Sequence, residues 1–267
     1  MRSIALMVFG VLSLVVADFC RAEEFPLRKN YPDVGYLELN EVKAGYDNKS
    51  MILVDVRSRM EFDTIHPLHA VHVDFSHQNF LSDLQKVVLD NPGKKIVLYD
   101  NGITCLKCYI GAQDALDEGL KDIYAFDGGI PAWAEAYPAE TLLMGKVIDD
   151  PGKQLIPYED FRKVSLDFAT FQQKASGAKN AVVIDARDPV QRMQKLPGFE
   201  NALPIPLDKL IRNVIDKGNM KDKQLFIFDQ VGRQARWLMY YLVAQGYKDY
   251  YFLEGGATSV LKEQEYR

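Results

Sequence analysis

Cys105 and Cys108 stand three residues apart in the segment DNGITCLKCY (100–109), with Lys107 between them. Two thiols at this spacing can close a disulfide, carry a sulfur atom or contribute to a metal site. A helix is expected from about residue 108, and its free N–H groups, its dipole and the Lys107 charge all favour thiolate. The sequence therefore predicts a reactive pair, with Cys105 as the attacking or sulfur-carrying residue and Cys108 as the resolving one.

The first 22 residues determine which chemistry is open to this pair. Arg2 precedes an apolar run over 4–17, and the segment ends in Cys20-Arg21-Ala22. This pattern predicts a signal peptide, 1–22, that is too short in its apolar part to serve as a comfortable membrane span. We therefore expect a periplasmic or secreted protein with no membrane attachment after cleavage. Its two remaining thiols can pair with each other in an oxidising compartment.

The composition excludes a polyanionic partner. The 267 residues are 48% hydrophobic and 11% aromatic, as expected of a globular chain with a substantial core. Removal of residues 1–22 takes away two basic residues and one acidic residue, which changes the formal net charge from −5 to about −6. There is no stripe of Lys and Arg, so we expect no binding to nucleic acid.

The chain repeats itself. Three motifs recur in the same order in both halves: ILVDVR (52–57) and VVIDAR (182–187), KIVLYD (95–100) and QLFIFD (224–229), GLKDIYAFDGG (119–129) and GYKDYYFLEGG (246–256). Each half has short β-branched and aromatic runs that end in Asp or Gly, with helical segments between them. This pattern predicts an α/β fold of two domains, each a parallel sheet flanked by helices.

The repeats also give the domain boundaries and the position of the thiols. We expect strands near 52–56, 96–100 and 123–126, a first domain over 35–140, a linker over 141–157 and a second domain over 158–267. Asp100 to Gly119 spans 19 residues, whereas the matching Asp229 to Gly246 spans 17. The two additional residues fall in the loop that carries the thiols. This loop follows the C-terminal end of a strand, where open α/β sheets bind their ligands.

The sequence resembles the rhodanese family. LVDVRSRMEFDTIHPLHAVHV (53–73) is similar to the first signature of that family, and DIYAFDGGIPAWAEAYP (122–138) is similar to its closing signature. The resemblance implies a tandem sulfurtransferase whose persulfide cysteine directly follows the central strand. The matching residues here are Asp100 and Asp229, which cannot accept sulfur. A carboxylate at Asp100 also repels thiosulfate.

The second half has no cysteine, so the resemblance implies a non-catalytic second domain. CLKCY in the first half resembles exported rhodanese-like proteins that carry a Cys-x-x-Cys-Trp motif, with Tyr109 in place of the Trp. The implied function is the handling of sulfane sulfur, or thiol–disulfide exchange, with a small sulfur compound or a protein thiol as partner and without a cofactor. Asp55 and Arg57 match family positions at a strand end, where they are expected to brace neighbouring loops.

Two alternatives remain open. The first is a binding module with a local disulfide. A disulfide that closes a four-residue loop stabilises the folded state by only about 1.9 kcal/mol, because it removes little entropy from the unfolded chain. The second is a Cys/His metal carrier, because all four histidines of the chain lie within 66–77. His69 and His72 are the candidate ligands, although no metal is expected. Arginine is absent six positions after either thiol, which excludes a phosphatase of the rhodanese fold.

Overall fold

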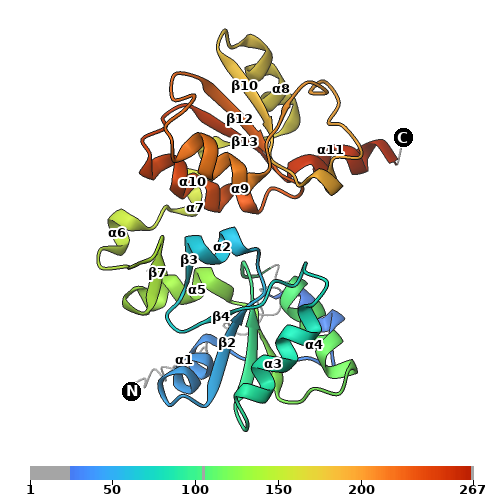
Figure 1. Ribbon diagram of the computed structural model, residues 1–267, viewed down its shortest axis with the longest axis vertical. Coiled ribbons are helices and arrows are strands. Elements are labelled where there is room, and N and C mark those ends of the chain that lie inside the picture. Colours follow the sequence, from blue (N-terminus) through green and yellow to red (C-terminus); the bar gives the residue numbers. More distant parts are fainter. Residues whose placement is uncertain (1–24, 104–105, 266–267) are drawn as a thin grey trace, which may run out of the picture.

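The computed structural model describes residues 25–103 and 106–265, which form two parallel sheets with helices on both faces (Figure 1). The predicted α/β class is confirmed. The expected signal peptide and Cys105 lie outside the described residues. Within the described part of the chain, no helix is both long enough and apolar enough to cross a bilayer.

The first sheet has the order β1-β6-β5-β2-β4, and every neighbouring pair is parallel. Its strands are β1 (Gly35–Tyr36), β2 (Met51–Asp55), β4 (Val71–His72), β5 (Lys95–Tyr99) and β6 (Ile123–Phe126). The strands predicted from the sequence agree to within one residue. In the central strand β5, Ile96 and Leu98 face one apolar cluster while Val97 and Tyr99 face another. The sheet is thus buried on both faces, as parallel sheets are.

Helices cover both faces of this sheet. The helices of the first half are α1 (Leu39–Asp47), α2 (Arg59–Thr64), α3 (Phe80–Asp90), α4 (Leu106–Asp117) and α5 (Gly129–Ala136), with 3-10 turns at Pro26–Asn30 and Pro138–Glu140. Leu84 of α3 and Ala112 of α4 pack on one face, whereas Val42 of α1 and Trp133 of α5 pack on the other. Helix α4, expected from about 108, begins at Leu106.

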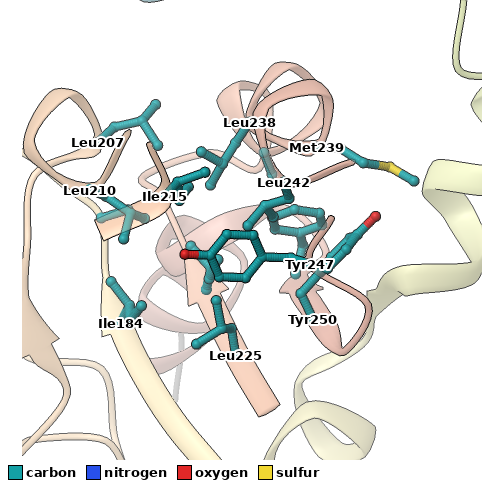
Figure 2. Packing of buried hydrophobic residues seen from close by; sticks show 14 of the residues in the cluster. Ile184, Leu207, Leu210, Ile215, Leu225, Leu238, Met239, Leu242, Tyr247 and Tyr250 are labelled. Carbon is teal, nitrogen blue, oxygen red and sulfur yellow. The ribbon is translucent and has the colours of Figure 1, made fainter. Parts of the chain in front are cut away.

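The second sheet repeats the first in the order β11-β10-β12-β13-β9, again with only parallel pairs. Its strands are β9 (Ser165–Leu166), β10 (Ala181–Asp185), β11 (Leu203–Pro204), β12 (Gln224–Phe228) and β13 (Tyr250–Leu253). Its helices are α7 (Tyr158–Val164), α8 (Phe168–Gly177), a 3-10 turn (Pro189–Gln191), α9 (Leu207–Leu210), a π-helical turn (Ile211–Ile215), α10 (Gln234–Ala244) and α11 (Gly256–Glu265). Figure 2 shows Leu238 and Leu242 of α10 packed over Ile184 and Leu225 of the sheet.

The expected linker contains regular structure. Strands β7 (Thr141–Leu143) and β8 (Lys146–Val147) form a hairpin that pairs, antiparallel, with β3 (Ile65–Pro67) of the first half. A short helix α6 (Pro151–Gln154) then leads into α7. This small sheet fastens the start of the connecting segment to the first domain.

Helix α10 joins the two halves. It lies against α2, which Figure 1 shows on the side of the first domain that faces the second. Trp237 and Tyr240 of α10 are buried in the same cluster as Val97 and Trp133 of the first half. The Tyr240 hydroxyl also accepts a hydrogen bond of 3.1 Å from the Ile156 N–H. The contact between the domains is therefore a continuation of the core.

Candidate functional site

Two buried aspartates mark equivalent positions in the two domains. Asp100 directly follows β5 and Asp229 directly follows β12, and each of these strands lies in the middle of its sheet. Each aspartate opens the loop that leads into the next helix, α4 or α10. The sequence predicted this equivalence from the recurring motifs, and the matching strand orders confirm it.

Asp100 sits at the C-terminal edge of the first sheet with one of its oxygens poorly satisfied. The Lys107 N–H donates to Asp100 Oδ2 at 3.3 Å, and no donor among the described residues reaches Oδ1. Burial raises the pKa of Asp100 to about 7, against the opposing positive charges of Arg233, Arg57 and Lys107. The negative charge of Glu61 adds to the rise. This carboxyl therefore changes its charge near neutral pH.

The Asp229 carboxylate lies inside the loop that joins β12 to α10 in the second domain. Its Oδ1 accepts the N–H of Gly232, and its Oδ2 accepts those of Gln234 at 2.8 Å and Ala235 at 3.3 Å. Burial raises the pKa of Asp229, while these N–H groups oppose the rise. The loop has the ring of inward N–H groups that suits an anion, and the protein's own carboxylate occupies it.

Cys108 lies in the first turn of α4 and is fully buried. It packs with Val54 and Phe80 in the cluster under the sheet, and it is disulfide-bonded. The described residues contain no other cysteine, so its partner lies outside them. The Lys107 ammonium donates to Ser76 Oγ at 3.3 Å, which links the start of α4 to the loop after β4.

Tyr109 occupies a structural position beside the pair. Its hydroxyl donates to Asp127 Oδ2 at 2.7 Å, and Asp127 also accepts from Arg28 Nε at 2.7 Å. The ring stacks on Tyr31 with 5.3 Å between centroids. Tyr109 therefore ties α4 to the N-terminal segment.

Asp55 and Arg57 form a buried ion pair. Arg57 Nε donates to Asp55 Oδ1 at 2.9 Å and its Nη2 donates to Oδ2 at 2.6 Å. The same Nη2 reaches the Ile65 carbonyl at 2.6 Å. Asp185 and Arg187 repeat the bidentate pair in the second domain. These pairs join the ends of β2 and β10 to the chain that follows them.

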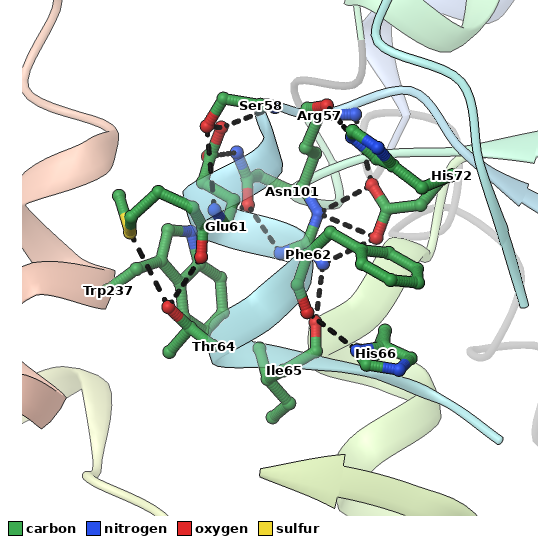
Figure 3. Close-up of polar contacts among 12 residues, drawn as sticks. Arg57, Ser58, Glu61, Phe62, Thr64, Ile65, His66, His72, Asn101 and Trp237 are labelled. Atoms are coloured by element: carbon green, nitrogen blue, oxygen red, sulfur yellow. Dashed lines mark hydrogen bonds and ion pairs between the residues drawn. The ribbon is translucent and has the colours of Figure 1, made fainter. Parts of the chain in front are cut away.

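Three residues at the mouth of the loop were not singled out from the sequence. Figure 3 shows Glu61, Asn101 and Trp237 linked by hydrogen bonds. Glu61 is buried and also accepts from Ser58 Oγ at 2.7 Å. Glu61 lies within the segment 53–73 that resembles the first family signature, which was a signal for it. The contact of Asn101 with Trp237 joins residues 136 positions apart and leaves no local pattern.

A cleft of about 600 Å³ lies between the two loops. Gly102 and Ile103 line it from the first loop, and Gly232 and Arg233 line it from the second. Arg236 of α10 forms part of the same wall. The ends of both central strands therefore open into one shared space.

The histidines have local partners. His66 stacks on Phe62 and its Nδ1 lies 2.6 Å from the Phe62 carbonyl oxygen, while His72 Nε2 lies 2.9 Å from the Arg57 carbonyl oxygen. His69 lines a separate pocket with Lys94. The described residues contain no group of three or more side chains placed to hold a metal.

The chain belongs to the rhodanese family, because the Rhodanese-like domain matches it twice, over residues 38–136 and 168–263. It is similar to the thiosulfate sulfurtransferase GlpE of Pseudomonas savastanoi pv. phaseolicola, with 31% identity over 91 residues, or 34% of this chain and 79% of that protein. It is also similar to the tRNA uridine(34) hydroxylase of Photorhabdus laumondii subsp. laumondii, with 30% identity over 45% of this chain and 33% of that protein.

Among solved structures, the chain is similar to a thiosulfate sulfurtransferase from Pseudomonas aeruginosa. The identity is 22% and the TM-score 0.39, over 86% of this chain and 43% of that one. The predicted family and its tandem arrangement are thus confirmed by the two matches along the chain.

Proposed function

We propose that the first domain handles sulfane sulfur, or exchanges thiols with disulfides, through Cys105 and Cys108. The observation that carries this proposal is the place of the oxidised Cys108, in the first turn of the helix that follows the central strand of the sheet. In parallel sheets that edge is where ligands bind. Membership of the rhodanese family and the name of the similar GlpE protein, a thiosulfate sulfurtransferase, support sulfur chemistry.

The burial of Cys108 supports different roles for the two thiols. An external thiolate must approach a sulfur atom to attack a disulfide, and Cys108 is 0% exposed. Attack by a partner therefore falls on Cys105, which releases Cys108 as a thiolate. In the reduced protein the Cys105 thiolate attacks the sulfane sulfur of a donor, gains that sulfur as a persulfide and expels the rest of the donor as its thiolate or sulfinate.

Cys105 can discharge the persulfide in two ways. An acceptor thiolate takes the outer sulfur and returns Cys105 as a thiolate. Alternatively, the Cys108 thiolate attacks Cys105 Sγ, forms the disulfide and expels hydrosulfide. The oxidised pair then needs two electrons from a dithiol partner, which fits a protein thiol as the second substrate.

The charges around the loop favour an organic donor over thiosulfate. Lys107 and Arg233 are positive, but the Asp100 carboxyl occupies the position directly after the central strand. Its ionised form, which dominates above pH 7, repels a dianion at short range. A donor with a single negative charge suffers less of this repulsion.

The second domain supports the first without reacting. Asp229 holds three N–H groups of its own loop, so that loop is closed to an external anion. We further propose export to the periplasm or the medium, because residues 1–22 have the pattern of a signal peptide and an oxidising compartment sustains the disulfide. Fractionation of cells that express the full chain tests this, since a full-length product in the cytosol contradicts export.

The competing function is a binding module in which the disulfide is only structural, and the complete burial of Cys108 fits that reading as well. A sulfur-transfer assay distinguishes the enzyme from the binding module. We expect the reduced protein to transfer sulfur from glutathione persulfide to cyanide, the Cys105→Ser variant to lose this activity, and Asp229→Asn to keep it. Equal rates in wild type and Cys105→Ser would favour the binding module.

A further inference from the structure

The cleft between the domains holds an arginine without a counter-charge. Arg236 is partly buried, and its guanidinium lies 5.3 Å from the Tyr158 ring centre and 5.2 Å from that of Trp237. Its Nε is buried without a hydrogen-bond partner in the described chain. Among the described residues no carboxylate forms an ion pair with Arg236, whereas the charge of the neighbouring Arg233 acts on the Asp100 carboxyl. A buried charge of this kind is costly unless an anion compensates it.

The other walls of the cleft are mainly apolar. Its apolar lining residues include Phe25, Ile103, Pro131, Tyr158, Phe161 and Trp237. Ile103 and Tyr158 expose 51% and 55% of their surface. Exposed apolar side chains that converge on a hollow are typical of a ligand site. Among the lining residues that the structure describes, the one carboxylate is Glu135, which is exposed.

The volume of the cleft favours an organic anion over an inorganic one. A cleft of about 600 Å³ is in the range that encloses an organic molecule of drug size, whereas an inorganic anion of a few atoms leaves most of it unfilled. Within the described part of the lining, two arginines and one exposed carboxylate give a net positive charge. The side chain of Tyr158, which is 55% exposed, offers apolar surface for a flat apolar body.

We propose that this cleft binds a small organic anion with an aromatic or similarly flat apolar body, whose acidic group pairs with Arg236 and Arg233. Such a ligand lies at the mouths of both loops, beside Gly102 and Gly232. The site stands on the lining of the cleft and does not depend on the sulfur chemistry proposed above.

The test is calorimetric titration of the full mature protein with naphthalene-2-sulfonate. Two matched probes accompany it: naphthalene-2-sulfonamide, which lacks the charge, and sodium sulfate, which lacks the rings. We expect one bound naphthalene-2-sulfonate per chain. Each comparison probe should bind more weakly by about tenfold or more, because each lacks one half of the recognition.

Three variants test where the ligand binds. Arg236→Gln should weaken binding of naphthalene-2-sulfonate by about tenfold, while Arg212→Gln, which removes an equal charge at a 69% exposed position, should leave it unchanged. Tyr158→Leu, at an exposed wall position, should weaken it by a smaller factor. Circular dichroism checks that each variant is folded.

Four results would overturn the proposal, the last of them in the case that Arg236→Gln does not fold. Equal affinity for sulfate would indicate an inorganic anion site, and equal affinity for the sulfonamide would indicate a purely apolar groove. Equal losses in Arg236→Gln and Arg212→Gln would show a nonspecific effect of charge. If Arg236→Gln fails to fold, unchanged binding in Tyr158→Leu alone contradicts the proposal. Because no turnover is measured, these results are independent of whether sulfur is transferred.

Discussion

Trp237 of the second domain donates its indole N–H to Asn101 Oδ1 of the first domain at 2.9 Å. Asn101 is the residue after Asp100, and its amide Nδ2 donates to Glu61 Oε1 at 2.7 Å. The start of the thiol-bearing loop is therefore held from both sides, by α2 of its own domain and by α10 of the other. The second domain thus contributes to the shape of the loop that follows β5.

The bond between Trp237 and Asn101 should contribute measurably to stability. We expect a coupling of about 0.5–1.5 kcal/mol in a double-mutant cycle of Trp237→Phe and Asn101→Ala, because both partners are buried or partly buried. The free energy of unfolding in urea measures it. Strictly additive effects would mean that the contact contributes only packing.

Gly129 should tolerate no side chain. Its φ is +58°, and a Cβ there would lie 2.4 Å from the Asp100 carbonyl oxygen and 2.5 Å from the Gly102 nitrogen. Gly129→Ala should therefore cost several kcal/mol, whereas Gly119→Ala, at φ +83° in open space, should cost only about 1–2 kcal/mol. Thermal unfolding compares the two. Similar losses at both positions would place the cost in the backbone conformation alone.

Asp100 should make stability depend on pH. Its pKa is raised from 3.8 to about 7 by burial, so ionising it opposes folding, and the penalty grows as the pH rises through that interval. Asp100→Asn should be increasingly stable relative to wild type from about pH 4 to 7, by at most about 4 kcal/mol, and the difference should then level off. Asp63→Asn, at an exposed position, controls for general loss of charge. A difference that stays constant with pH would contradict the burial effect.

Replacement by serine should reduce the stability of the protein by different amounts at the two cysteines. Cys108→Ser places a polar atom in an apolar cluster and should destabilise the reduced protein by about 1–3 kcal/mol, while Cys108→Ala avoids that cost. Cys105→Ser should lose only the contribution of the short disulfide loop, about 1.9 kcal/mol, and only under oxidising conditions. Urea unfolding with and without reductant measures both. Unfolding of the reduced Cys105→Ser variant without denaturant would identify that residue as structural.

The sequence predicted the sheets well because their information is local. β-branched runs placed β2, β5 and β6 to within one residue, and the recurring motifs aligned Asp100 with Asp229. The burial of Cys108 was also accessible, since Cys108, Ala112 and Ala115 follow helical spacing and share one buried face. The expected start of α4 at about residue 108 put Cys108 at the N-terminal end of the helix, whereas α4 begins at Leu106.

What the sequence did not predict depends on contacts between distant segments. The hairpin of β7 and β8 exists because β3, far earlier in the chain, supplies its partner. The capture of three backbone N–H groups by Asp229 is a property of loop geometry that residue types do not encode. The cleft and its arginines arise only when both domains are in place.

The most direct test of the central claim is the intact mass of the reduced protein after one exposure to glutathione persulfide. We predict the gain of one sulfur atom, located by peptide mapping on Cys105, removed by cyanide and retained in Asp229→Asn. Cys105→Ser should gain nothing. A wild-type protein that gains no sulfur, or a Cys105→Ser variant that gains as much as wild type, would contradict sulfur transfer through this pair.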